Sequence, residues 1–276
     1  MVAGLPHTNS GLNISGGNMA LQNKKSLGQN WLKDRDTLID IADIASTDGV
    51  SEVLEIGPGL GTLTSALFQF FDKVTAVELD ERLATNLPKS FPGKNLTVIN
   101  KDILTLDLAE LNLPEKYVVA GNIPYYITSP IIQKCLHTKH KPAKIVFLVQ
   151  KEVAERLAAE QGDYSILGLS AQIYADVSLG PVVKREFFTP PPKVDSQVVI
   201  LEPLATPRAS ESTISLIKLG FIAPRKKLLS NLAMGLQLPR EEILGYFQVN
   251  GISENARPAD LSIENWCALE KNIHKR

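Results

Sequence analysis

The sequence has few cysteines, no long apolar run and almost no net charge, and each shortage excludes a class of protein. Only two of the 276 residues are cysteine, Cys135 and Cys267, and their spacing suits neither a metal site nor a disulfide framework, which favours a reducing compartment. No apolar run approaches the roughly 20 residues that a membrane-spanning helix needs. The first 23 residues carry no charged side chain, unlike a secretory signal or a transit peptide. We therefore expect a cytoplasmic protein with no membrane segment and no bound metal.

Apolar runs alternate with helical patterns through the first two thirds of the chain, which predicts the mainly parallel sheet of an α/β fold. The predicted strands are 51–56, 74–77, 97–100, 117–120 and 144–149, and the predicted helices are 37–46, one starting near 62, and 151–159. Two further stretches, 172–177 and 196–201, have β-rich character. After a linker at 203–212, helices are predicted at 213–221, 226–234, 240–247 and 263–273. The expected division is a disordered leader at 1–23, an α/β domain at 24–205 and a small helical domain at 206–276.

The first predicted strand runs directly into a glycine-rich loop, Gly57 to Gly61, which precedes a helix. Glycine is needed where a backbone approaches a ligand closely, because a Cβ would occupy that space. The loop differs from a dinucleotide fingerprint, which has two residues before its last glycine, whereas Leu60 alone separates the last pair here. It also has no lysine of the phosphate-binding type, so phosphoryl transfer is not expected.

Two acidic residues follow, near the ends of the next two predicted strands. Glu78 is placed where a carboxylate can accept both ribose hydroxyls of a nucleoside, and Asp102 where it can accept from an adenine amine. As alternatives, Glu78 is an exposed strand-end charge and Asp102 is a helix cap or turn former. Together with Gly57 and Gly59 they favour a nucleoside site, since ligands of open α/β sheets bind at the carboxyl ends of the strands.

The stretch Asn122-Ile123-Pro124-Tyr125 follows a predicted buried strand. The Asn122 side-chain oxygen and the Pro124 backbone carbonyl are expected to accept the two N–H groups of a flat amine such as adenine N6, while Tyr125 stacks on the base. This arrangement would aim the lone pair of the amine without acid/base chemistry. The alternative is a simple turn, since Asn and Pro both favour turns. A nucleoside beside such a socket indicates S-adenosylmethionine as cofactor and methyl transfer as the reaction.

The ordered motifs resemble those of the ribosomal RNA adenine dimethyltransferase family, and the ending resembles its bacterial small-subunit branch. The matching segments are 25–32, 55–59, 77–80, 122–125, 150–154, 188–196, 225–228 and 261–266, together with Phe221 and Arg257. The chain departs from the pattern at Trp31, where the family usually has phenylalanine.

The resemblance implies a Rossmann-like methyltransferase fold with a small helical C-terminal domain, and that fold would require the stretches 172–177 and 196–201 to pair as a hairpin. It implies dimethylation of N6 on two adjacent adenines near the 3′ end of small-subunit RNA, within a pre-30S particle, by a monomer with a role in small-subunit biogenesis. It further implies that Phe188 faces Tyr125 across the target base, with Phe187 in the core. The residues that it implies for cofactor contact are Asn30, Leu32, Gly57, Glu78, Asp102 and Asn122.

Three other functions share parts of this pattern. A large-subunit adenine methyltransferase would have the same socket, although the ending at 257–266 favours the small-subunit branch. A DNA-adenine or protein-glutamine methyltransferase would usually carry a second proline where Ile123 stands. An RNA-binding assembly factor without catalysis would not need the intact cofactor set.

A formal net charge of −1 is low for an RNA-binding protein, because phosphate contacts need lysine and arginine. Basic residues nevertheless gather in short clusters, at 24–25, 139–144, 184–185, 225–227 and 271–276. Several clusters on one face would form a local positive track despite the neutral total. We predict RNA contact for Arg225, Lys226 and Lys227, and assign 271–276 to a solvated end.

Overall fold

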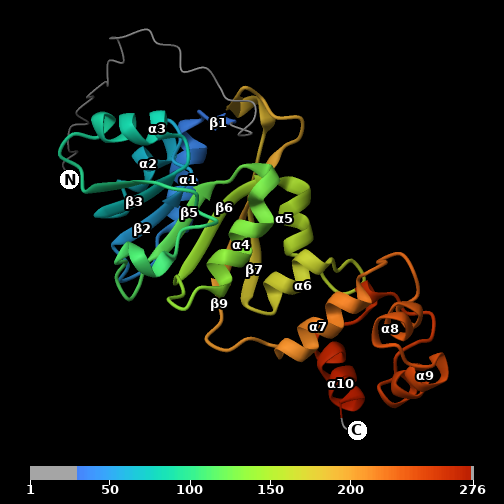
Figure 1. Ribbon diagram of the computed structural model, residues 1–276. Helices are drawn as coiled ribbons and strands as arrows, with labels where there is room; N and C mark the ends of the chain where they lie inside the picture. The colour runs from blue at the N-terminus through green and yellow to red at the C-terminus, as the bar shows by residue number, and fades with distance from the viewer. Residues whose placement is uncertain (1–29, 275–276) are drawn as a thin grey trace, which may run out of the picture.

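The computed structural model describes residues 30–274. Its centre is a seven-stranded sheet (Figure 1). Its strands are β2 (Glu52–Ile56), β3 (Lys73–Glu78), β4 (Leu96–Asn100), β5 (Val118–Asn122), β6 (Lys144–Gln150), β7 (Ala175–Val183) and β9 (Ser196–Pro203). They lie in the order β4-β3-β2-β5-β6-β9-β7, with β2 to β6 parallel and β9 antiparallel to both of its neighbours. The predicted α/β fold is confirmed, and the predicted leader at 1–23 lies outside the described residues.

Helices cover both faces of the sheet because alternate residues of its buried strands point to opposite sides. In and beside β5, Val118 and Ala120 pack into one apolar cluster, while Tyr117 and Val119 pack into the other. The first cluster includes side chains of α1 (Arg35–Ala45) and α2 (Thr62–Leu67). The second includes side chains of α4 (Thr128–His137), α5 (Lys151–Leu157) and α6 (Ile166–Gln172). A short helix, α3 (Glu81–Asn86), follows β3 and contacts β3 and β4.

The helix starts follow local capping rules. The Asp34 carboxylate caps α1 by accepting the Thr37 N–H at 3.0 Å, and the Asp80 carboxylate caps α3 by accepting the Arg82 N–H at 3.0 Å. Only Leu79 and Asp80 separate the end of β3 from the start of α3, and the carboxyl end of β3 lies next to the glycine loop that follows β2.

Two features differ from the sequence prediction. Residues 172–174 are not strand: α6 runs to Gln172, Ser165 caps its start, and the hairpin strand begins only at Ala175. A separate two-stranded ribbon, formed by β1 (Trp31–Leu32) and β8 (Phe188–Thr189), was not predicted. The ribbon joins the beginning of the described chain to the segment that precedes β9.

Four helices follow the sheet and gather at one end of the molecule (Figure 1). They are α7 (Glu211–Gly220), α8 (Leu228–Leu236), α9 (Arg240–Val249) and α10 (Ile263–Ile273), each within two residues of its predicted bounds. Their buried side chains are continuous with the cluster on the α4–α6 face of the sheet. The predicted boundary between 24–205 and 206–276 falls between β9 and α7, and the division into two domains stays a prediction. Among the described residues, no helix has both the length and the apolar character required to cross a membrane.

Candidate active site

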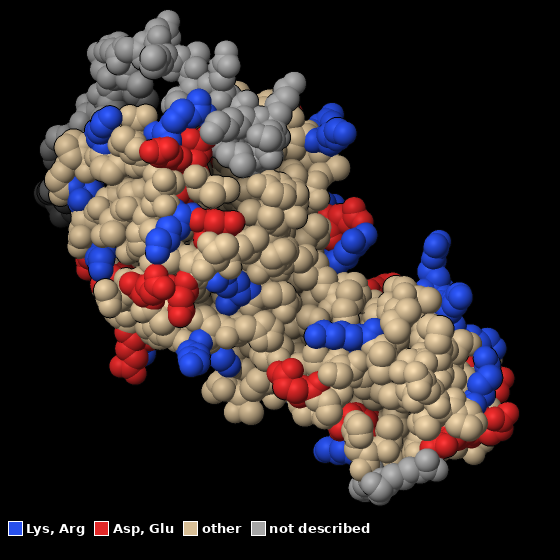
Figure 2. All heavy atoms as spheres, viewed as in Figure 1, with Lys and Arg blue, Asp and Glu red and all other residues tan. Residues whose placement is uncertain are grey.

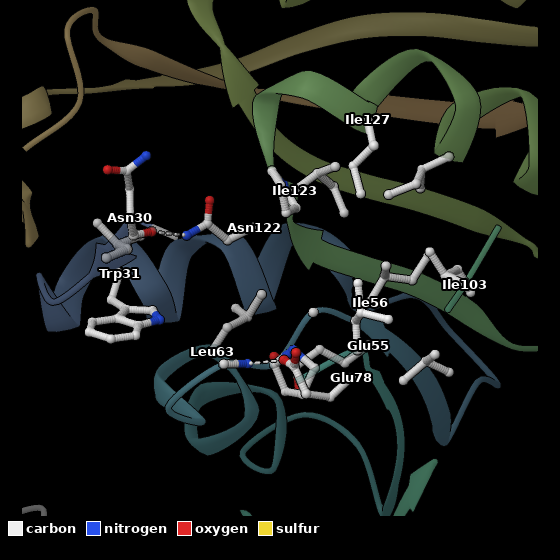
Figure 3. Close-up of a pocket in the computed structure, with 18 of the residues that line it drawn as sticks. Asn30, Trp31, Glu55, Ile56, Leu63, Glu78, Ile103, Asn122, Ile123 and Ile127 are labelled. Atoms are coloured by element: carbon white, nitrogen blue, oxygen red, sulfur yellow. Dashed lines mark hydrogen bonds between the residues drawn. The ribbon is translucent and has the colours of Figure 1, made fainter. Parts of the chain in front are cut away.

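A pocket opens at the carboxyl ends of β2, β3 and β5, where the register brings the strand ends together (Figure 3). Every residue predicted to contact the cofactor lines this pocket: Asn30, Leu32, Gly57, Gly59, Glu78, Asp102 and Asn122. Pro124 and Tyr125 also line it. Residues separated by up to 95 positions in the sequence therefore share one cavity, at the edge where open α/β sheets bind ligands.

The glycine loop is held against β3 by Glu78. The Glu78 carboxylate accepts the Gly59 N–H through Oε2 at 3.0 Å and the Asp80 N–H through Oε1 at 2.8 Å. Gly57 and Gly59 both have positive φ angles, of 70° and 58°, which L side chains rarely adopt. The Trp31 indole lies against Gly59, since its Nε1 would be 3.2 Å from an added Cβ. The loop is thus shaped by its own backbone conformation and by one buried carboxylate.

Burial raises the pKa of Glu78, while its bonds to the backbone N–H groups of Asp80 and Gly59 oppose that rise. The side chain is only 6% exposed, so the alternative of an exposed strand-end charge is wrong. Each oxygen accepts one backbone N–H and has capacity for a further donor. Such a carboxylate can accept one hydrogen bond from each of two hydroxyl groups on neighbouring carbons.

Asp102 forms the turn that its sequence position allowed, and it lies in the pocket. Its Oδ1 accepts the Leu104 N–H at 2.9 Å, which makes it a turn former, and it lines the pocket as well. Within residues 30–274, Oδ2 has no hydrogen-bond partner. The turn fixes the side chain and leaves one carboxylate oxygen for a ligand.

The Asn122 amide is oriented by the chain itself. Its Nδ2 donates to the Asn30 backbone carbonyl at 3.0 Å, a contact between residues 92 positions apart. Because that bond uses the amino side of the amide, Oδ1 points away from Asn30 (Figure 3). No donor within the described residues reaches Oδ1, so the site offers an oriented acceptor.

The Pro124 carbonyl differs from the prediction. It accepts the Ile127 N–H at 3.2 Å and the Thr128 hydroxyl at 3.3 Å, within the turn that leads into α4. These two bonds occupy the acceptor capacity of a carbonyl oxygen. The preceding carbonyl, of Ile123, has no partner within the described residues, and Ile123 also lines the pocket. Its N–H donates to the Leu148 carbonyl at 3.1 Å, which fixes Ile123 beside β6.

Tyr125 is held through its hydroxyl, which shares a 2.8 Å hydrogen bond with the Ser196 hydroxyl. Burial raises the pKa of Tyr125, so the phenol stays neutral over the physiological range. The ring lies in the pocket wall next to Pro124 and Asn122. A flat, neutral ring at this place is suited to stacking rather than to proton transfer.

The structure differs from the predicted locations of Phe187 and Phe188. Phe187, predicted as core, is 36% exposed, whereas Phe188 is 3% exposed and packs with Leu32 in the cluster of α1 and α2. The reason is the ribbon: Phe188 is paired with the buried Leu32, so its neighbour along the chain points the other way. Phe188 is not among the residues that line the pocket, and its stacking on a target base stays a prediction.

Glu55 is a pocket residue that the sequence reading missed. It is 1% exposed, its Oε2 accepts the Thr64 hydroxyl at 2.6 Å, and its Oε1 is buried without a partner among residues 30–274. Burial raises the pKa of Glu55 to about 8, and the charge of Glu78 adds to that rise. The available signal was an acidic residue inside an otherwise apolar strand that leads into a glycine loop.

The raised pKa of Glu55 predicts that the unliganded protein loses stability as the pH rises. The unfolded state ionises near the ordinary value of 4.5, whereas the folded state keeps its proton up to about 8. Between these values the unfolded state binds fewer protons, so the free energy of unfolding should fall, by an amount on the order of a few kcal/mol. Urea unfolding at several pH values should show this fall in the wild type and a flatter profile in Glu55→Gln. Glu115→Gln, at an exposed position, should keep the wild-type slope; an equally steep profile in Glu55→Gln would contradict the assignment.

The predicted RNA-contact residues lie outside this pocket. Arg225, Lys226 and Lys227 are exposed on the turn between α7 and α8, and the Lys227 ammonium donates to the Asn255 side chain. Figure 2 shows basic side chains along the outer edge of the C-terminal helices, with acidic ones among them. The described residues contain no group of three or more His, Cys, Asp or Glu that could hold a metal ion.

Comparisons with known proteins show the family to which the chain is related. The family model described as ribosomal RNA adenine dimethylase matches residues 20–275. A Desulfitobacterium hafniense protein named ribosomal RNA small subunit methyltransferase A is 40% identical, covering 91% of this chain and 92% of its own. A protein of the same name from Clostridium acetobutylicum is 38% identical, covering 91% and 94%.

Two solved structures are similar over most of the chain. One is a dimethyladenosine transferase from Plasmodium falciparum, with a TM-score of 0.75, 26% identity, and coverage of 88% of this chain and 97% of its own. The other is the 23S rRNA methyltransferase ErmE, with a TM-score of 0.70, 30% identity, and coverage of 89% and 100%. Both the pocket and the C-terminal helices lie within the range that the family model matches.

Proposed function

The chain belongs to the ribosomal RNA adenine dimethylase family, and from that premise we propose that it dimethylates N6 of two adjacent adenines near the 3′ end of small-subunit RNA. The methyl donor is S-adenosylmethionine. The observation that carries this proposal is the Asn122 amide, which Asn30 orients within the same pocket as the glycine loop and Glu78. This shared pocket supports a nucleoside cofactor bound beside an oxygen that holds the target amine.

The residues present suit S-adenosylmethionine. Glu78 would accept the ribose hydroxyls, the unpartnered oxygen of Asp102 would accept from the adenine amine, and the backbone of Gly57 and Gly59 permits close approach. When bound, the cofactor supplies an electrophilic methyl carbon, whose bond to the positively charged sulfur breaks with the electron pair remaining on sulfur.

The chain's role in the reaction is to hold the target amine. The lone pair of adenine N6 is delocalised into the ring, so the amine must be fixed for the pair to point at the methyl carbon. Asn122 Oδ1 accepts one N–H, and the carbonyl of Ile123 accepts the other, because the Pro124 carbonyl is already bonded twice. Tyr125 stacks on the ring. The nitrogen becomes strongly acidic once the N–C bond forms, so its proton passes to water without a general base.

The small-subunit substrate is supported by the relatives at 38–40% identity that are named for it. The likeness to ErmE makes large-subunit RNA the alternative substrate. Incubating the chain with methyl-labelled cofactor and unmethylated small or large subunits, and then mapping the labelled bases, separates the two. We expect label on two adjacent adenines of the small subunit; label confined to the large subunit would overturn the proposal.

We further propose that the chain acts as a cytoplasmic monomer on a pre-30S particle and contributes to its assembly. The family membership supports this, since an RNA-modifying enzyme meets its substrate where subunits are built. A binding-only assembly factor would not need the cofactor pocket described above, and calorimetry with S-adenosylmethionine discriminates the two. Absence of binding would favour the factor without catalysis.

Replacing Arg225, Lys226 and Lys227 with alanine should weaken RNA binding without changing cofactor affinity. Each lost phosphate contact should lower the slope of log affinity against log salt by about 0.7 to 0.9, and the triple change should cost about tenfold to a hundredfold in affinity near physiological salt. Filter binding over a salt series measures both quantities. Lys271→Ala serves as the control, because it removes one positive charge from the end that is assigned to solvent. An unchanged slope in the triple variant would reject the predicted RNA contact.

A further inference from the structure

The hydrogen bond between Tyr125 and Ser196 joins a single turn to the central sheet. Tyr125 begins a short 3-10 turn, Tyr125–Ile127, whereas Ser196 starts β9 and pairs with Gln150 of β6 on one side and Val183 of β7 on the other. Ser196 is fully buried. The sheet therefore fixes the position of the Ser196 hydroxyl. The 2.8 Å hydrogen bond to this hydroxyl in turn restrains the orientation of the Tyr125 ring.

The two methyl transfers to one adenine make different demands on that ring. In the first transfer, N6 carries two hydrogens, which Asn122 Oδ1 and the Ile123 carbonyl can both accept. After it, the monomethylated amine carries only one hydrogen, so one of the two oriented contacts is lost. The ring of the base must then be held more by stacking than by hydrogen bonds. The orientation of Tyr125 consequently matters more in the second transfer than in the first.

We propose that Ser196 is a positioning residue for the second methyl transfer: by holding the Tyr125 hydroxyl, it fixes the stacking surface on which monomethylated adenine is aligned. The inference rests on the function proposed above. In each transfer one N–C bond forms, one S–C bond breaks with its electron pair remaining on sulfur, and one proton leaves N6 for water. Ser196 takes part in none of these bond changes and acts only through the Tyr125 ring.

The same bond can be removed from either side, which gives the test its control. Ser196→Ala deletes the anchor, and Tyr125→Phe deletes the anchored hydroxyl while leaving β9 and the ring in place. Tyr174→Phe is the matched control, because the Tyr174 hydroxyl also donates to one side chain, Glu211 at 3.1 Å, but lies outside the pocket lining. The double variant of Ser196 and Tyr125 should behave like either single variant, since both remove one bond.

The experiment is a single-turnover time course on unmethylated small subunits, with enzyme and S-adenosylmethionine in excess and unmodified, monomethylated and dimethylated adenine quantified at each time. In Ser196→Ala and Tyr125→Phe the second transfer should slow about tenfold more than the first, so that monomethyladenine accumulates. Tyr174→Phe should keep the wild-type ratio of the two rates. Thermal unfolding of each variant reports any loss of stability separately.

Equal slowing of the two transfers in Tyr125→Phe would overturn the inference, as would additive effects in the double variant. If Ser196→Ala fails to fold, Tyr125→Phe still decides, because it does not alter the sheet. If the wild type produces no methylated adenine, the proposed function is refuted. If the wild type dimethylates adenine and the variants keep its ratio of monomethylated to dimethylated product, this inference alone is refuted.

Discussion

Asn122→Ala should reduce the single-turnover rate of methyl transfer by about 10² to 10³-fold, because the amine of the target base loses one of its two oriented acceptors. The affinities for S-adenosylmethionine and RNA should change far less. The reason lies in the geometry: Asn122 contributes one oxygen to the site, and its other amide atom is already used by Asn30 at 3.0 Å. The rate of the chemical step should therefore fall with binding largely kept.

Asn122→Asp sharpens this test. The carboxylate keeps an oxygen in place of Oδ1 but loses the N–H that donates to the Asn30 carbonyl. Its second oxygen then faces the Asn30 carbonyl oxygen with no hydrogen between them. We expect a rate between those of the wild type and Asn122→Ala, with recovery at low pH, where the introduced carboxyl group is protonated and again donates to Asn30. The exposed Asn86 donates its amide to the Arg82 carbonyl at 2.8 Å and gives a matched control, Asn86→Ala, that should keep the wild-type rate.

Quenched-flow methylation with small subunits gives the rate, and calorimetry gives the cofactor affinity. A rate near that of the wild type in Asn122→Ala would remove the amine-holding role and with it the observation on which the proposed function depends. A parallel loss of cofactor affinity would instead show that the bond to Asn30 serves mainly to shape the cofactor pocket.

The sheet could be predicted from the sequence because its strands are buried on both faces. A strand such as β6 is an unbroken apolar run, and the glycine loop and the acidic residue that end β2 and β3 mark where each strand stops. The same reasoning placed Glu78, Asp102 and Asn122 in one pocket, since parallel strands bring their carboxyl ends to one edge. Periodicity and topology were sufficient for these features.

Other features depend on contacts that no local pattern encodes. The ribbon of β1 and β8 has two residues in each strand, too short for any period to be visible, and its register decides that Phe188 is buried and Phe187 exposed. The β-rich composition of 172–174 was overridden by the Ser165 cap and the packing of α6 against α4 and α5. The occupied carbonyl of Pro124 follows from a turn whose hydrogen bonds the sequence does not show.

Contacts between side chains on different elements account for the rest. Ser196 meets Tyr125 across 71 positions, and Glu55, which lines the pocket, accepts a hydrogen bond from Thr64 of the helix that follows the glycine loop. Glu55 and Ser196 both stand in segments that match the family, 55–59 and 188–196, but neither segment shows which side chain its residue meets. In both cases the partner, rather than the residue type, defines the role, and partners are fixed only by tertiary packing.

Glu78→Gln should weaken S-adenosylmethionine binding by about a hundredfold, the size expected when two charge-assisted hydrogen bonds to ribose hydroxyls are lost or weakened. The carboxylate presents two acceptor oxygens, each already accepting one backbone N–H, from Gly59 and from Asp80. An amide has only one acceptor oxygen, so its NH2 group must face either a backbone N–H or a hydroxyl that needs an acceptor. Calorimetry measures the change, with the exposed Glu81→Gln as a control that should bind as the wild type does.

The same substitution also disturbs the glycine loop, so affinity alone does not prove contact with the ribose. A cycle that combines the variant with a 2′,3′-dideoxy analogue of S-adenosylhomocysteine separates the two effects, because the analogue lacks the hydroxyls but still meets the loop. If Glu78 accepts the hydroxyls, Glu78→Gln should weaken binding of the parent compound much more than binding of the analogue. Equal weakening of both would assign Glu78 to holding Gly59 and leave the ribose contact to another pocket residue.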